Sequence, residues 1–457
     1  MGLAIQQYVS SNQERFLGEL KDFLRIPSVS TLPEHRPDIE RAAQFVADEF
    51  RRIGMTQVEI IPTAGHPLVY AEWLGAPGKP TVLCYGHYDV QPAEPLDLWK
   101  SPPFEPDIRE GNIYARGAAD DKGQFFAHLK AAEGFLKQTG RLPINLKFLI
   151  EGEEEVGGKS IEKYVPAHRE KLRADAVLVS DTEMFAPGLP SLDVGLRGLV
   201  YLEVHARAAS HDLHSGLYGG AAPNPLIALA EIITACKNRE GKILIPGFYR
   251  RVKQPSKAEL AAWKRLPFNE KKWQREGVGA PALTGEKGYS VLERIWARPT
   301  FEVHGIVGGF VGAGGKTVIP AEATAKVSMR LVPDQKPDEI LKLFKAHLKK
   351  VTPKGVEVSV QVLSEAPAVV VPTDNPYIEA AVETLAEVFG KRAVFVRSGG
   401  SIPVVTLFAE QLKTPVVMMG WGLPDDNLHA PNEKLNLGNF YKGIECTMRF
   451  FERVAAF

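Results

Sequence analysis

INLKFLIEGEEEVGG occupies residues 144–158 and joins a run of mostly apolar residues to a group of glutamates. The run INLKFLI has the length and apolar character of a buried β-strand, and three consecutive glutamates follow it closely. Two further runs, TVLCY at 81–85 and AVLVS at 176–180, have the same form and are also followed by acidic or histidine residues. Buried strands of this kind, separated by segments with helical periodicity, predict an α/β domain with a largely parallel sheet.

Segments with helical periodicity surround these strands. Apolar residues recur three and four positions apart from Phe16 and again from Ala42, and Gly54 provides a stop signal after the second pattern. Helices are predicted at 16–24, 42–53, 123–137, 160–168 and 375–389, and at the C-terminus through 440–451. Further short β-rich runs lie at 58–61, 68–74 and 415–419.

The pattern changes near Leu199 and changes back near Asn375. Between these points, alternating runs such as YLEVHARA and TAKVSMRLV predict strands, and two helices are predicted at 225–236 and 337–350. This is typical of a small α+β layer with two helices on one sheet. The irregular stretch 241–299 is expected to contain long loops. We therefore predict a discontinuous α/β domain, residues 1–197 and 368–457, with a smaller α+β domain inserted at 198–367.

Composition excludes several functional classes. The 457 residues contain 55 Lys plus Arg and 55 Asp plus Glu, so there is no basic excess for nucleic acid or an anionic membrane surface. Three cysteines are too few and too scattered for a disulfide framework or a Cys-based zinc site. No apolar run approaches the ~18 residues that a membrane span needs, and the N-terminus has no secretory signal pattern. A cytoplasmic protein that binds neither nucleic acid nor membranes is expected.

Potential metal ligands follow the predicted strands. In open α/β sheets, ligand sites form at the carboxyl ends of the strands, so these side chains could converge on one crevice. A Gly- and Ala-rich turn, ARGAADDKG, could bring another carboxylate to the same place. The residues in question are His87, Asp89, Asp120, Asp121, Glu153, Glu154, Glu155, Asp181 and His429.

Two histidines with several carboxylates suit zinc, manganese or cobalt better than calcium, because imidazole favours the later transition metals. Two ions held ~3.5–4 Å apart need a bridging carboxylate with further ligands on each side, and this set is large enough for two sites. A carboxylate outside the ligand set could then take a proton from water.

Each of these features also has a purely structural interpretation. Asp120 and Asp121 could only cap a helix, three consecutive glutamates are often a solvated face, and Asp181 could cap a turn. Their joint placement after apolar strands is what favours a metal centre.

Ten segments resemble the M20 metallopeptidases, and especially the dipeptidase branch that includes cytosolic non-specific dipeptidase and carnosinase-like enzymes. They occur in the family order and span most of the chain. This resemblance implies a zinc-peptidase-like catalytic domain with a ferredoxin-like lid or dimerisation domain inserted in it. The segments include GHYDVQP at 86–92, ARGAADDKG at 115–123, EGEEEVGG at 151–158, VSDTE at 179–183, HDLHSGLYGG at 211–220, MRLVP at 329–333, GGSIPV at 399–404 and LHAPNEK at 428–434.

The resemblance also implies roles for individual residues. Asp120 would be the carboxylate that bridges two divalent metal ions, most simply Zn²⁺, with Mn²⁺ or Co²⁺ as alternatives. Glu154 would be the general base, and Asp89 would orient His87. The implied ligands of the first ion are His87 and Asp181, and those of the second are Glu155 and His429.

Substrate groups are implied in the inserted domain and near the domain junction. His214 resembles the histidine that stabilises the tetrahedral oxyanion, often from the partner subunit of a homodimer. Arg330 resembles the arginine that binds the substrate C-terminal carboxylate, which a guanidinium can do in a bidentate fork. Thr317, Gly400 and Ser401 are expected to line the pocket.

The sequence therefore predicts a metallopeptidase that hydrolyses dipeptides or other short peptides with a free C-terminal carboxylate. Deacylation of N-acyl amino acids by the same metal site is the alternative. A non-catalytic metal-binding scaffold is disfavoured because every mapped position carries the expected residue type. A serine hydrolase is disfavoured because no G-x-S-x-G elbow is present.

Overall fold

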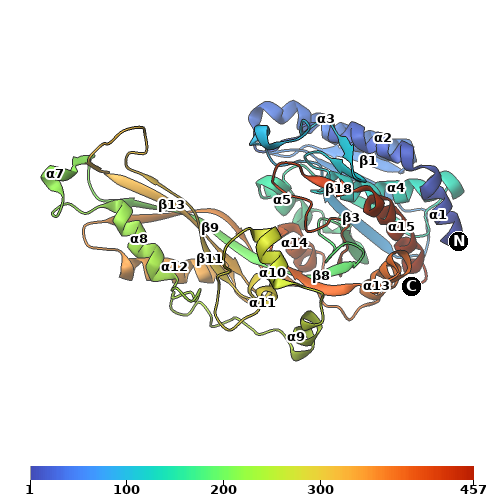
Figure 1. Ribbon diagram of the computed structural model, residues 1–457. Helices are drawn as coiled ribbons and strands as arrows, with labels where there is room; N and C mark the ends of the chain where they lie inside the picture. Colours follow the sequence, from blue (N-terminus) through green and yellow to red (C-terminus); the bar gives the residue numbers. More distant parts are fainter. Residues whose placement is uncertain (1) are drawn as a thin grey trace. The chain divides into compact units, whose positions relative to one another are not determined.

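The computed structural model describes residues 2–457, which form two compact units (Figure 1). Unit 1 comprises the described residues up to Val194 together with Val371–Val396 and Pro403–Phe457. Unit 2 comprises Gly195–Val370 and the short segment Arg397–Ile402. The α/β fold class, with a smaller α+β unit inserted in a discontinuous larger one, is confirmed.

The main sheet of unit 1 has a parallel centre and antiparallel flanks. Strands β6, β3, β7 and β17 run parallel to one another, whereas β2 is antiparallel to β6 and β1 to β2. The central strands are buried along almost their whole length, as expected for a sheet covered on both faces. In order, the strands are β1 (Gln57–Ile61), β2 (Leu68–Trp73), β6 (Asn145–Glu151), β3 (Thr81–His87), β7 (Ala176–Val179), β17 (Val416–Met418), β8 (Ser191–Leu196) and β15 (Val369–Val370), with β16 (Val394–Ser398) paired to β8. By sequence, β15 and the last two residues of β8 and of β16 fall within the bounds of unit 2.

Helices cover both faces of this sheet. Val82 and Cys84 of β3 lie in one large apolar cluster with α3, α4, α13 and α15, while Tyr85 contacts Phe408 of α14 on the opposite face. The α-helices of unit 1 are α1 (Gly2–Ser11), α2 (Gln13–Leu24), α3 (Arg36–Ile53), α4 (Lys122–Thr139), α5 (Lys159–Ala167), α6 (Arg169–Leu172), α13 (Pro376–Phe389), α14 (Pro403–Gln411) and α15 (Leu437–Val454). Short 3-10 turns occur at η1 (Pro33–His35), η2 (Leu96–Leu98) and η3 (Glu154–Val156). Among residues 2–457, no helix is long and apolar enough to cross a membrane.

A small three-stranded sheet joins distant parts of unit 1. It has the order β18 (Lys434–Asn436), β5 (Asn112–Tyr114) and β4 (Asp107–Arg109), with both pairs antiparallel. This sheet was not predicted, because its three-residue strands carry almost no periodicity. It places the chain after His429 beside the turn that leads into α4, and so brings two motifs more than 300 residues apart next to each other.

Unit 2 has the ferredoxin-like order of elements. A four-stranded antiparallel sheet, β11-β13-β9-β14, carries the helices α8 and α12, which share its apolar cluster. Its elements are β9 (Gly198–Arg207), β10 (Leu213–His214), α7 (Ser215–Tyr218), α8 (Pro225–Cys236), α9 (Lys257–Lys264), α10 (Glu270–Lys272), the π-helical η4 (Trp273–Val278), α11 (Val291–Trp296), β11 (Thr300–Gly308), β12 (Val318–Ile319), β13 (Glu322–Leu331), α12 (Pro337–Val351) and β14 (Glu357–Ala366). The stretch 241–299 thus holds short helices between its loops.

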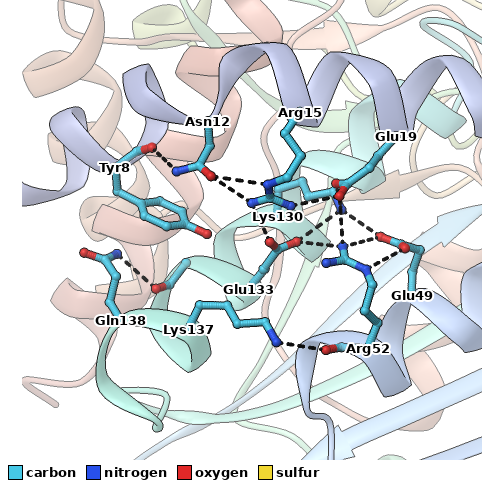
Figure 2. Close-up of polar contacts among 11 residues, drawn as sticks. Tyr8, Asn12, Arg15, Glu19, Glu49, Arg52, Lys130, Glu133, Lys137 and Gln138 are labelled. Atoms are coloured by element: carbon cyan, nitrogen blue, oxygen red, sulfur yellow. Dashed lines mark hydrogen bonds and ion pairs between the residues drawn. The ribbon is translucent and has the colours of Figure 1, made fainter.

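A network of charged side chains connects α2, α3 and α4 (Figure 2). We call it the α2–α4 charge network. Lys130 is fully buried, and its Nζ lies 2.5 Å from Glu19 Oε2, 2.7 Å from Glu49 Oε2 and 3.2 Å from Glu133 Oε2. Arg15 and Arg52 also contact Glu133, at 2.6 and 3.0 Å. Three carboxylates therefore face three basic groups, and their charges balance.

Replacing Lys130 by methionine should destabilise unit 1, because Glu133 would keep its buried charge without its nearest buried cation. Removing one partner of a buried ion pair costs about 3–5 kcal/mol, so the thermal unfolding midpoint of the metal-free protein should fall by several degrees. Lys137→Met is the matched control, because exposed Lys137 lies on the same helix and donates to the Arg52 carbonyl oxygen instead of a carboxylate. Equal midpoints for the two variants would contradict this role for the network.

Candidate metal centre

Asp120 lies between two histidines that come from opposite ends of unit 1. Its Oδ1 is 3.0 Å from His87 Nε2, and its Oδ2 is 2.9 Å from His429 Nε2. One carboxylate therefore presents a different oxygen to each imidazole. This is the arrangement expected of a carboxylate that bridges two metal ions.

Two further carboxylates complete two groups of ligand atoms that share Asp120. His87, Asp120 and Asp181 form one group, and Asp120, Glu155 and His429 form the other. Within each group the ligand atoms all lie within 4.8 Å of one another. The structure thus brings together the five residues for which the sequence predicted metal binding.

The sheet explains why these side chains meet. His87 is the last residue of β3, Asp181 follows β7 by two residues, and Glu155 lies in the 3-10 turn after β6. These three parallel strands end at the same edge of the sheet. Asp120 lies two residues before α4, in the turn between β5 and that helix.

His429 reaches the centre from a loop with unusual backbone geometry. Its φ is +58°, and Asn427 and Asn432 nearby have φ values of +57° and +62°. A left-handed conformation is uncommon for histidine and often marks a functional site. More than half of the His429 side chain is exposed, so solvent reaches this side of the centre.

Asp89 holds two parts of the centre together. Its Oδ1 and Oδ2 accept the backbone N–H groups of Glu154 and Glu155, at 3.3 and 3.1 Å. His87 Nδ1 is 3.1 Å from the Asp89 carbonyl oxygen and 3.4 Å from its Oδ1. Asp89 therefore fixes both the ring of His87 and the turn that carries Glu154.

The centre has an excess of negative charge. Among residues 2–457, no lysine or arginine forms an ion pair with Asp120, Glu154, Glu155 or Asp181. Burial raises the pKa of Asp181 to about 7, and the charge of Asp120 adds to this increase. Burial also raises the pKa of Glu154 well above its ordinary value, with His87 opposing the increase and Asp181 adding to it.

The pKa values of His87 and His429 are also raised, which for an imidazole favours the charged form. Hydrogen bonds to Asp120 and Glu155 raise the pKa of His429 to about 11. For Asp120 itself, burial opposes ionisation, but the hydrogen bonds from His429 and His87 hold its pKa below its ordinary value. Protons on the histidines thus supply positive charge that this set of carboxylates requires.

Divalent ions fit this donor set. Imidazole nitrogens and carboxylate oxygens, without a basic side chain among them, are suitable ligands for zinc or manganese. Glu19, Glu49 and Glu133 form a third cluster of close carboxylates, but Lys130, Arg15 and Arg52 already neutralise it (Figure 2). The basic side chains in this third cluster therefore distinguish it from the candidate metal centre, which has none among the described residues.

The sequence did not predict a role for Glu433. It is fully buried, and its Oε1 accepts the N–H groups of Ala119 and Asp120, at 2.9 and 3.1 Å. Its Oε2 accepts the N–H of Gly117 at 2.9 Å and pairs with Arg116 at 2.8 Å. One carboxylate thus shapes the turn that presents Asp120. Glu433 lies inside the motif LHAPNEK and Arg116 inside the motif ARGAADDKG. Their position in these two family-like motifs is the feature of the sequence that could have indicated a role at the site.

Gln91, also without a predicted role, supports the second ligand group. Its Nε2 donates to Glu155 Oε2 at 2.8 Å. Gln91 lies in the motif GHYDVQP, which carries His87 as well. A polar residue four positions after a candidate ligand gives little reason by itself to expect this contact.

The remaining predicted site residues belong to unit 2, where they form two separate groups. One group contains His214 and Thr317, and the other contains Arg330, Gly400 and Ser401. His214, in β10, is exposed, and its neighbour Ser215 donates its N–H to the Thr317 carbonyl oxygen at 3.0 Å. Elsewhere in unit 2, Arg330 Nη1 donates to Ser401 Oγ at 2.9 Å, beside Gly400. Arg330 is largely buried, which lowers the pKa of its guanidinium.

Glu433→Gln should weaken metal binding. Four N–H groups now donate to the two carboxylate oxygens of Glu433, and a glutamine amide has only one oxygen to accept them. Loss of such supporting contacts typically reduces metal affinity about 10–100-fold. Competition with a chromogenic zinc chelator measures this affinity. Glu410→Gln, at an exposed position of α14, is the control and should bind as the unmodified chain does. Unchanged affinity in Glu433→Gln would show that this carboxylate does not support the centre.

Comparisons with known proteins identify the family of the chain. The family model of peptidase family M20/M25/M40 matches residues 83–453. The chain is 32% identical to the Cys-Gly metallodipeptidase dug1 of Schizosaccharomyces pombe, covering 99% of this chain and 98% of the relative. It is 31% identical to the Beta-Ala-His dipeptidase of Homo sapiens, covering 98% and 92% of the two chains.

Solved structures give the same result. The dipeptidase Dug1p from Saccharomyces cerevisiae matches with a TM-score of 0.89 at 29% identity, covering 100% of this chain and 99% of that one. The M20 metallo-carboxypeptidase Sso-CP2 from Sulfolobus solfataricus matches with a TM-score of 0.88 at 32% identity, covering 97% and 99%. The resemblance predicted from the sequence motifs is thereby confirmed: the chain belongs to peptidase family M20 and is a metal-dependent hydrolase.

Proposed function

We propose that this metallopeptidase hydrolyses dipeptides and other short peptides that have a free C-terminal carboxylate, using two divalent metal ions. The observation that carries the proposal is the sharing of Asp120 between two ligand groups that have no basic counter-charge. The Cys-Gly and Beta-Ala-His dipeptidases among its relatives support the substrate class.

In this proposal one ion is held by His87, Asp120 and Asp181, and the other by Asp120, Glu155 and His429. Zn²⁺ is the metal that this mixed donor set suits best, with Mn²⁺ or Co²⁺ as alternatives. When bound, such ions lower the pKa of water and polarise a carbonyl group.

Glu154 is the proposed general base and acid. It belongs to neither ligand group, and its electrostatic neighbours include His87, Asp181, Glu155 and Asp120, so its carboxylate faces the same space. It would take a proton from the attacking water and return it to the leaving amine. Asp89 would keep His87 and the Glu154 turn in place during the reaction.

Unit 2 would supply the groups that recognise the substrate. Arg330 would hold the free carboxylate in a bidentate fork, with Gly400 and Ser401 beside it. His214 and Thr317 would act at the scissile group. His214 Nδ1 accepts the N–H of Gly216 at 3.0 Å, which leaves Nε2 for a substrate oxygen.

In this proposal the protein is a homodimer, in which His214 of one copy acts on the substrate bound by the other copy. Around β10, large apolar side chains are exposed to an unusual degree, and such patches mark protein–protein contacts. These residues are Leu217 (77% exposed), Tyr218 (48%) and Val311 (91%), which lies in the loop that leads into β12, the partner strand of β10.

Assays of the metal-stripped protein, resupplied with Zn²⁺, Mn²⁺ or Co²⁺, test the proposed reaction. Unblocked dipeptides should be cleaved in a metal-dependent way, and N-acetyl amino acids should be much poorer substrates. Glu154→Gln should lower kcat by about 10²–10⁴-fold, because general acid–base catalysis contributes roughly this factor. Glu410→Gln, on an exposed helix position, is the control and should retain full activity.

Cleavage of the acylated amino acids alone would overturn the dipeptidase assignment and favour the deacylase alternative. Undiminished activity of Glu154→Gln would remove Glu154 from the mechanism.

A further inference from the structure

Arg197 occupies the single position between β8 and β9, and it contacts three consecutive residues of a distant loop. Its backbone N–H donates to the Gly400 carbonyl oxygen at 3.1 Å. Its Nε donates to the Gly399 carbonyl oxygen at 3.0 Å. Its own carbonyl oxygen accepts the hydroxyl proton of Ser401. Both main chain and side chain of Arg197 thus fix the loop 399–401.

Ser401 connects the loop 399–401 to Arg330 by a hydrogen bond. Because the Ser401 hydroxyl donates its proton to Arg197, its oxygen is free to accept, and Arg330 Nη1 donates to it at 2.9 Å. The direction of each hydrogen bond in the chain Arg197–Ser401–Arg330 is therefore determined. All three residues belong to unit 2.

The loop has little room to move. A Cβ atom added to Gly399 would lie 3.0 Å from Arg197 Nη2 and 3.1 Å from the Ile295 carbonyl oxygen. The guanidinium of Arg197 makes two longer contacts as well, at 3.5 and 3.4 Å, to the carbonyl oxygens of Arg294 and Arg298 near the end of α11. The side chain of Arg197 is thus enclosed by backbone oxygen atoms.

In the part of the chain that the structure describes, neither arginine pairs directly with an acidic side chain. Among residues 2–457, no aspartate or glutamate forms an ion pair with Arg197 or Arg330. Burial, followed by the charge of Arg330, lowers the pKa of Arg197 to about 10, and the more distant charge of Glu302 only partly opposes this decrease. A carboxylate would normally fix the orientation of a buried arginine, and here hydrogen bonds to neutral oxygens take that role. Arg330 therefore keeps its charge available for an incoming anion.

We propose that Arg197 is a positioning residue for substrate recognition, which acts through the loop 399–401 and Ser401 to hold the Arg330 guanidinium ready for the C-terminal carboxylate of the substrate. This inference rests on the proposed function, because it requires Arg330 to bind that carboxylate. Arg197 itself makes no contact with the substrate in this proposal.

Binding measured without turnover tests the proposal. The Zn²⁺-saturated Glu154→Gln protein would be titrated calorimetrically with an unblocked dipeptide and with the same dipeptide amidated at its C-terminus. Arg330→Gln, Arg197→Gln, Arg197→Lys and the Arg197→Gln/Arg330→Gln double variant would be made in this background. Arg207→Gln is the matched control, since exposed Arg207 lies at the end of β9 and its Nε also donates to a carbonyl oxygen.

Arg330→Gln should raise the Kd of the dipeptide about tenfold to a hundredfold, since a charge-assisted hydrogen bond is lost. Arg197→Gln should raise it about tenfold, and Arg197→Lys by a similar factor, because an ammonium cannot reproduce the guanidinium geometry. Neither arginine variant should change the Kd of the amide. The double variant should bind like Arg330→Gln alone, within about twofold, because residues acting through one contact are not additive.

Three results would overturn the inference. The first is a double variant whose increase in dipeptide Kd is the product of the two single increases. The second is a wild-type Kd for Arg197→Lys, which would mean that the charge of residue 197 matters and its hydrogen-bond geometry does not. The third is an equal loss of affinity for acid and amide, which a general structural role would produce. If Arg330→Gln leaves dipeptide affinity unchanged, the carboxylate-binding part of the proposed function fails together with this inference.

Discussion

The contact on which the centre depends is the pair of hydrogen bonds that the two oxygens of Asp120 make with His87 and His429. Four carboxylates lie in this region without a lysine or arginine among their ion-pair partners in residues 2–457, and the histidines supply the only positive charge. Such a concentration of buried negative charge costs free energy unless cations neutralise it. The α2–α4 charge network shows how unit 1 solves the same problem where no metal is required, since Lys130, Arg15 and Arg52 fill the space between three glutamates. The two clusters of acidic residues therefore differ in what neutralises them: basic side chains in the α2–α4 charge network, and, in the described part of the chain, only histidines at the candidate metal centre.

The fold brings the centre together from five places in the sequence. Three parallel strands deliver His87, Glu155 and Asp181 to one edge of the sheet. The turn before α4 delivers Asp120, and Glu433 holds that turn through three backbone N–H groups while β18 pairs with β5 beside it. Because Glu433 lies four residues after His429, one short segment supplies a candidate ligand and also fixes the turn that carries Asp120. The arrangement of His429 therefore cannot change without affecting Asp120.

Much of this was predictable from the sequence, for identifiable reasons. The strands β3, β6 and β7 were predicted close to their observed bounds because they are short, continuously apolar and buried on both faces. The alternating pattern of β9 and β13 predicted a small α+β layer in unit 2, and the family resemblance implied its ferredoxin-like order. In contrast, β4, β5 and β18 are too short to leave a periodic signal, and the contacts of Arg197 and three of the four hydrogen bonds of Glu433 are made to backbone atoms or to Ser401. A partner that is a backbone N–H or carbonyl oxygen has no residue type, so the residue types in a motif do not reveal the contact. The choice between Asp120 and Asp121 came from the family resemblance, and the structure places Asp120 between the histidines while Asp121 accepts the His87 backbone N–H.

The central claim is that two metal ions share Asp120, and a calorimetric titration of the metal-free protein with Zn²⁺ tests it most directly. The account predicts two equivalents per chain for the unmodified protein, one for His429→Ala, and strongly weakened binding of both for Asp120→Asn. The α2–α4 charge network should bind none, because its own basic residues neutralise it. A single equivalent in the unmodified protein, or two tight equivalents in Asp120→Asn, would contradict the account.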